Sequence, residues 1–144
     1  MSARFSKEML SLRAEDEEDF SVISAFLQDS LVRLCDVTYL KNEQQFIMVI
    51  HRLVREGRLT ESFDGVPEAR VQTGLCFEAV RSVHVRGISQ EERNIFLRFL
   101  TVAYSGDEIS LIFDQDGVIR LCGNNMICLF RDLGVTPGAD GPNV

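Results

Sequence analysis

The stretch EDEEDFSVISAFLQD, from Glu15 to Asp29, decides the fold class, because it is the one segment of this chain with a convincing helical pattern. Five consecutive acids open it, and negative charge is favoured at the start of a helix by the helix dipole. Asp16 is suited to the N-cap, with Asp19 three residues later as a capping-box acid. The apolar residues recur at helical spacing and predict one buried stripe: Phe20, Ile23, Phe26, Leu27 and Leu31.

From Leu31 onward the apolar period changes to two, which is typical of β-strands. We expect a hairpin with strands at Val37–Leu40 and Gln45–Val54, joined by residues 41–44. Its second strand is apolar on both faces, which predicts a central place in the sheet, with the helix covering one face. Residues 55–69 lose all periodicity and are expected to form the longest loop. Further strands are expected at residues 9–13, 71–77, 79–86, 95–104, 108–113, 118–122 and 126–130.

Short reversals dominate the second half of the chain, and short connections force antiparallel neighbours. We therefore expect an α+β fold, a mostly antiparallel curled sheet, roll or partly closed barrel of about eight strands with one amphipathic helix near the N-terminus. A chain of 144 residues fits one domain, which we place at residues 9–134. Residues 1–8 and 135–144 are expected to be flexible termini.

Composition excludes several classes of protein. The net charge of −7 argues against a general nucleic-acid binder, which needs Lys and Arg to neutralise phosphates. No apolar run approaches the ~20 residues that span a bilayer, and the N-terminus lacks the apolar core of a secretory signal. We therefore expect a cytoplasmic protein that does not enter membranes, with its four cysteines reduced.

No catalytic, metal or cofactor site is predicted. The chain has no glycine-rich phosphate loop and no Ser-centred nucleophile elbow. Cys122 and Cys128 lack a second ligand pair for zinc, so the cysteines are expected to be core residues. His51 is interpreted as a structural strand residue and His84 as a surface residue. The sequence Asp114–Gly117 is interpreted as a hairpin turn, because no Glu follows at the spacing of an EF-hand loop.

Five arginines lie in predicted strands, and two interpretations stay open for them. If they align on one face, they would make an anion-binding stripe in an acidic protein. The favoured alternative is cross-strand pairing with Glu78, Glu108 or Asp114. The five are Arg70, Arg81, Arg86, Arg98 and Arg120.

The segment AEDEEDFSVISAFLQDSL, residues 14–31, resembles the opening of an uncharacterised bacterial family, a domain of unknown function found chiefly in alphaproteobacteria. The likeness continues in LCFEAVRSVHVRGI (75–88) and GVIRLCGNNMICLFRDLG (117–134), and it covers most of residues 10–134. This chain has no tryptophan, although the family carries one in the second hairpin strand and another after the final Asp-Leu-Gly. The resemblance supports the fold and implies no activity, because the family has none assigned.

Polar positions that match the family motifs are our candidate binding residues: Asp29, Asp36, Arg52, Arg86 and Arg120. The favoured function is a non-enzymatic module that binds a protein or a small anionic ligand, since no nucleophile–base set is present. One alternative is an enzyme of unrecognised type, with Asp36 and Arg52 in a barrel mouth. That hypothesis requires a deep pocket lined by an acid, an arginine and His51. The other alternative is a homodimer that pairs edge strands.

Overall fold

The computed structural model of the protein describes residues 9–53 and 70–135. These residues form one helix, α2 (Glu17–Leu27), and nine strands, so the predicted α+β class is confirmed. The expected loop at 55–69, the expected flexible residues 1–8 and residues 136–144 of the expected flexible segment 135–144 lie outside the described part of the chain, whereas Val135 is the last residue of a strand. The strands are β1 (Ser11–Ala14), β2 (Leu31–Leu40), β3 (Gln45–Leu53), β4 (Arg70–Glu78), β5 (Ser82–Arg86), β6 (Phe96–Tyr104), β7 (Glu108–Phe113), β8 (Val118–Cys122) and β9 (Ile127–Val135).

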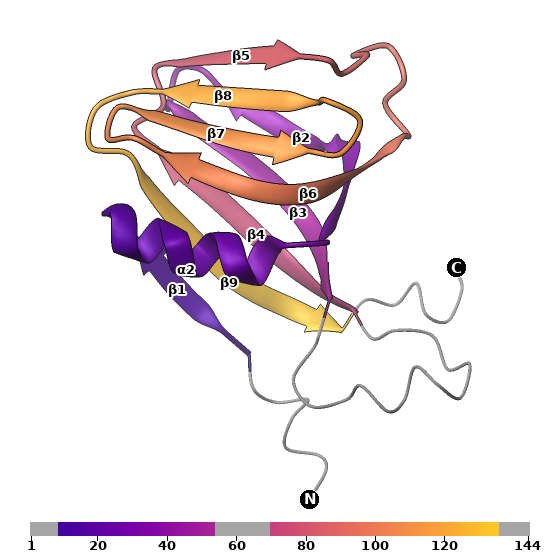
Figure 1. The fold of residues 1–144 in the computed structure, drawn as a ribbon, viewed down its shortest axis with the longest axis horizontal. Coiled ribbons are helices and arrows are strands. Elements are labelled where there is room, and N and C mark those ends of the chain that lie inside the picture. Colours follow the sequence, from indigo (N-terminus) through magenta and orange to yellow (C-terminus); the bar gives the residue numbers. More distant parts are fainter. Residues whose placement is uncertain (1–8, 54–69, 136–144) are drawn as a thin grey trace, which may run out of the picture.

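The nine strands form one open sheet in the order β1-β9-β4-β3-β2-β6-β7-β8-β5. Every neighbouring pair is antiparallel, as predicted. The central place predicted for the second hairpin strand is confirmed, because β3 pairs with β2 on one side and β4 on the other. Strands β6, β7, β8 and β5 run across the front of β2, β3 and β4 (Figure 1). The sheet therefore bends where β2 meets β6, and its two halves face each other.

Helix α2 begins as the sequence predicts. The Asp16 carboxylate accepts a hydrogen bond from the Asp19 backbone N–H at 2.9 Å, and the Asp19 carboxylate accepts one from the Glu15 N–H at 3.0 Å. The helix ends at Leu27 because the chain reverses, and Asp29 has a positive φ of 68°. The predicted extension of the buried stripe to Leu31 is wrong, since that residue already begins β2.

The apolar face of α2 packs into the bend of the sheet, as predicted. The side chains of Phe20, Ile23 and Leu27 are buried, and the Phe20 ring stacks on Tyr104 with their centroids 4.5 Å apart. Figure 1 shows α2 lying in front of β4 and β9, below β6. No helix in the described part of the chain is long and apolar enough to cross a bilayer.

Strand β2 contains an irregularity that separates its second half from β6. It pairs with β6 over Leu31–Arg33 alone, and its register with β3 shifts between Val32 and Val37. A bulge bends a strand and increases its local twist. The second half of β2 therefore stays with β3 but leaves β6, so a gap forms between β2 and the strands of the other half.

Candidate functional site

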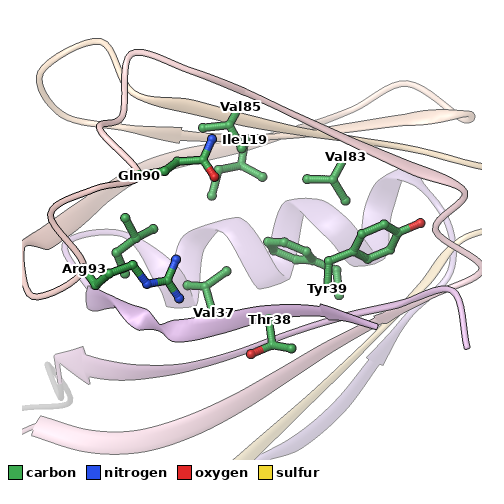
Figure 2. A pocket seen from close by; sticks show the side chains of 10 residues that line it. Val37, Thr38, Tyr39, Val83, Val85, Gln90, Arg93 and Ile119 are labelled. Atoms are coloured by element: carbon green, nitrogen blue, oxygen red, sulfur yellow. The ribbon is translucent and has the colours of Figure 1, made fainter. Parts of the chain in front are cut away.

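A pocket of about 350 Å³ lies where the two halves of the sheet face each other. β2 and β3 supply its floor, β5 and β8 supply its roof, and the connection from β5 to β6 closes one end (Figure 2). Most of its lining is apolar, which is typical of small-molecule sites. The lining residues are Leu34, Val37, Thr38, Tyr39, Phe46, Val83, Val85, Gln90, Arg93 and Ile119.

Two polar side chains, Gln90 and Arg93, lie together at one end of this pocket, and Tyr39 lies at the other (Figure 2). The Arg93 guanidinium points into the space between floor and roof. The Tyr39 hydroxyl is already engaged, because it donates a hydrogen bond to the Val80 carbonyl at 2.8 Å. The polar end of the pocket is therefore formed by Gln90 and Arg93.

Backbone hydrogen bonds fix the position of Arg93. The Cys35 N–H, in the bulge of β2, donates to the Arg93 carbonyl oxygen at 2.8 Å, and the Leu34 N–H donates to the Ile95 carbonyl at 3.1 Å. The β2 bulge thus has two effects. It separates β2 from the other half of the sheet, and it binds the β5–β6 connection that closes one end of the resulting gap. A site whose backbone is held in this way is partly preorganised for a ligand.

Gly87 sets the start of this connection and should tolerate no side chain. Its φ is +75°, and a Cβ there would lie 2.3 Å from the Asp116 carbonyl oxygen. We expect Gly87→Ala to lower the free energy of unfolding by about 2–4 kcal/mol, from backbone strain together with a steric clash. Urea denaturation followed by circular dichroism measures the loss.

Gly106 provides the matched control for this change. It also has a positive φ, +84°, but no atom lies within 4 Å of the Cβ position. Gly106→Ala should therefore cost about 1–2 kcal/mol, which is the backbone strain alone. Equal losses for the two variants would contradict the close approach of Gly87 to Asp116.

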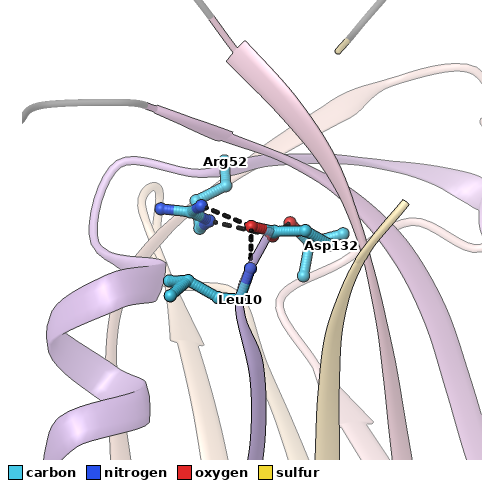
Figure 3. Close-up of polar contacts among 4 residues, drawn as sticks. Leu10, Arg52 and Asp132 are labelled. Carbon is cyan, nitrogen blue, oxygen red and sulfur yellow. Dashed lines mark hydrogen bonds and ion pairs between the residues drawn. The ribbon is translucent and has the colours of Figure 1, made fainter. Parts of the chain in front are cut away.

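A second polar cluster is buried on the other side of the bend, around Asp132 (Figure 3). The Asp132 carboxylate accepts hydrogen bonds from Arg52 Nη2 at 2.8 Å and Nε at 3.3 Å, from Thr73 Oγ1 at 2.7 Å and from the Leu10 N–H at 2.9 Å. Arg52 and Asp132 are 4% and 6% exposed. The four bonds saturate the carboxylate, so the cluster holds β1, β3, β4 and β9 together.

Arg52 is thus in a structural position, and it is not the partner of Asp36 as the enzyme hypothesis supposed. Its guanidinium lies over the rings of both Phe26 and Phe130, with centroid distances of 5.5 and 5.7 Å, and the two rings are neighbours with centroids 5.9 Å apart. Asp36 is exposed in the β2 bulge, where it accepts a weak hydrogen bond from the Cys35 thiol at 3.9 Å. Arg52 does not pair with Asp36 because its side chain points into the interior, where it forms an ion pair with Asp132.

The remaining candidate residues are also dispersed. Asp29 forms the reversal after α2, with its N–H bonded to the Phe99 carbonyl at 2.9 Å and its own carbonyl bonded to Arg70 at 3.1 Å. Arg86 and Arg120 follow the pocket residues Val85 and Ile119, so they point to the opposite face of the sheet. The five candidates do not form one cluster, and a binding role for them stays a prediction.

Cross-strand pairing accounts for part of the arginine pattern. Arg120 lies 3.6 Å from Glu108, and Arg98 lies 3.6 Å from Asp114. Both acids are among the three partners that the pairing interpretation named. Arg81 lies just before β5, outside the strands. The other interpretation, an anion-binding stripe, is less favoured here because Arg98 and Arg120 each have an acid within ion-pair distance.

His51, Cys76 and Cys128 lie outside these clusters and have shifted pKa values. Burial lowers the pKa of His51 and outweighs the opposing effect of Asp36. Burial raises the pKa of the Cys76 and Cys128 thiols, which keeps both protonated. Cys128 is in the core as expected, but Cys35 is exposed, which contradicts the core interpretation for that residue. No three His, Cys, Asp or Glu residues in the described ranges are placed to hold a metal ion.

Sequence reasoning missed the pocket residues Gln90 and Arg93. Both residues lie between the strands expected at 79–86 and 95–104 and outside the segments that resemble the family, so neither is among the candidate binding residues. A signal was available, since Val83 and Val85 alternate with polar residues and so predict an apolar inner face of β5. Nothing local, however, indicates that this face lies opposite β2.

The fold and the pocket together define a class: a small α+β protein with an open antiparallel sheet and a mostly apolar pocket with a cationic end. Within that class, the chain belongs to the family described as Protein of unknown function (DUF2948), whose model matches residues 10–141. No curated protein and no solved structure matches the chain. The expected membership of an uncharacterised family is thereby confirmed.

Proposed function

We propose that this protein is a non-enzymatic module that binds a small molecule in the pocket between β2–β3 and β5–β8. The observation that carries this proposal is the mostly apolar pocket of about 350 Å³, which has Gln90 and Arg93 at one end. Ligand pockets in proteins have volumes of about 300–1,000 Å³ with few polar groups that fix orientation. A water molecule takes about 30 Å³ of liquid volume, so this pocket suits a ligand of about a dozen non-hydrogen atoms.

The lining favours binding over catalysis. It contains no His, Asp, Glu, Cys or Lys, which are the usual general acids, bases and nucleophiles. The enzyme hypothesis required an acid, an arginine and His51 in one pocket. Arg93 supplies an arginine, but His51 lies on the outer face of β3 and no acid lines the pocket.

A neutral probe tests the proposal without assuming the charge of the ligand. We expect 2-naphthamide, with about a dozen non-hydrogen atoms, to bind saturably with a Kd of about 1 mM, from about 0.3 kcal/mol for each atom. Val83→Phe, which fills the pocket from β5, should weaken binding at least about tenfold. Fluorescence titration of the probe measures both constants.

Val22 provides the matched control, because it is a valine of α2 that is 47% exposed and lies outside the pocket. Val22→Phe should leave the Kd of 2-naphthamide unchanged, and far-ultraviolet circular dichroism should confirm that both variants fold. If 2-naphthamide does not bind, or binds equally well to Val83→Phe, the pocket is not the site.

The source organism and the cellular location of the protein are part of the same proposal. The chain's resemblance supports an alphaproteobacterial origin, and we propose a cytoplasmic location with it. The exposed Cys35 thiol agrees with a reducing compartment. Binding to a protein partner and homodimer formation through an edge strand stay predictions.

A further inference from the structure

We infer that the ligand of this pocket is a hydrophobic monocarboxylate, held at its acid end by Arg93 and Gln90. This inference rests on the proposed function and adds the chemical class of the ligand to it. The evidence is the charge at one end of the pocket, where Gln90 and Arg93 are exposed, the geometry of this polar end and the shape of the remaining lining.

The pocket holds one formal charge, and it is positive. Arg93 is the one ionised side chain in the lining, and no Asp or Glu lines the pocket to neutralise it. Within the described residues, Arg93 has no carboxylate within ion-pair distance, in contrast to Arg98 and Arg120, which each have one at 3.6 Å. A cationic group beside an apolar surface favours an anionic ligand and disfavours an amine.

The polar end also suits a carboxylate by geometry. A guanidinium presents parallel N–H donors that match the two oxygens of a carboxylate. Gln90 lies at the same end of the pocket as Arg93, nearer the roof (Figure 2), and an amide side chain has an NH₂ group that can donate a further hydrogen bond. The two side chains are three residues apart on one connection, whose Arg93 carbonyl is bonded to the β2 bulge.

The rest of the lining fits the apolar body of such a ligand. Between the polar end and Tyr39, the pocket presents aliphatic and aromatic side chains, with Thr38 on the floor. A second charged group on the ligand would have no partner there, and an unpaired charge beside apolar walls is unfavourable. The ligand therefore has one acidic group and one apolar body. The apolar walls are Leu34, Val37, Phe46, Val83, Val85 and Ile119.

The test compares 2-naphthoate with 2-naphthamide, which share size and ring system and differ in charge. We expect 2-naphthoate to bind about 10–100-fold more tightly, because charge-assisted hydrogen bonds are about twice as strong as neutral ones. Arg93→Met should remove this preference and leave the Kd of 2-naphthamide within about twofold. Arg93→Lys, which keeps the charge but loses the paired donors, should give an intermediate value.

Arg131→Met is the matched control, because Arg131 is an exposed arginine of β9 outside the pocket lining. Arg131→Met should change the Kd of neither 2-naphthoate nor 2-naphthamide. Binding of 2-naphthamide by Arg93→Met shows that the variant folds and that the pocket is intact. If both compounds bind the parent protein equally, or if Arg93→Met keeps the preference for 2-naphthoate, the ligand class is wrong although the pocket is a binding site. If neither compound binds, the proposed function fails as well.

Discussion

Replacing Asp132 by alanine should lower the free energy of unfolding by about 3–5 kcal/mol, because it leaves the Arg52 guanidinium buried without its counter-charge. Arg52 is 4% exposed, and both of its bonds in the cluster go to Asp132. The variant also leaves the Thr73 hydroxyl and the Leu10 N–H without their acceptor. Urea denaturation of the variant and parent proteins measures the loss.

Glu108→Ala is the control for this prediction. It removes the partner of Arg120 at 3.6 Å, where both side chains are about half exposed, so it should cost at most about 1 kcal/mol. The double variant Arg52→Met/Asp132→Leu should be more stable than Asp132→Ala alone, because no unpaired charge remains in the interior. A loss for Asp132→Ala as small as that for Glu108→Ala would contradict the buried cluster.

The second large effect is expected at Phe20, where α2 joins the sheet. Phe20 is 1% exposed and stacks on Tyr104, so Phe20→Ala should cost about 3–5 kcal/mol by creating a cavity. Phe96→Ala is the matched control, because Phe96 is 50% exposed on β6 and should lose about 1 kcal/mol or less. Thermal or urea denaturation measures the loss of stability in each variant. Equal losses for the two variants would contradict the packing of α2 on the sheet.

The helix and most strands could be predicted because their signals are local. The N-cap at Asp16, the apolar spacing from Phe20 to Leu27 and the alternation in Gln45–Leu53 all act within one element. The helix end was predicted less well, because Leu31 continues the helical spacing although the chain has already reversed at Asp29. A positive φ at a non-glycine residue gives no clear signal in one sequence.

The candidate site could not be predicted in the same way, because it depends on contacts between distant segments. Arg52 and Asp132 are 80 residues apart, and only the register of β3, β4 and β9 brings them together. Arg93 reaches the pocket because the β2 bulge binds its backbone. Neither relation follows from periodicity, so the sequence alone does not show that Arg52 is buried against Asp132.

The central claim is that the pocket between the two halves of the sheet receives a ligand, and a crystal structure with saturating 2-naphthoate tests it most directly. We expect density for the naphthalene ring between Val37 and Val85, with the carboxylate about 3 Å from the Arg93 guanidinium. An empty pocket at saturation, or the compound bound elsewhere on the protein, would contradict the claim.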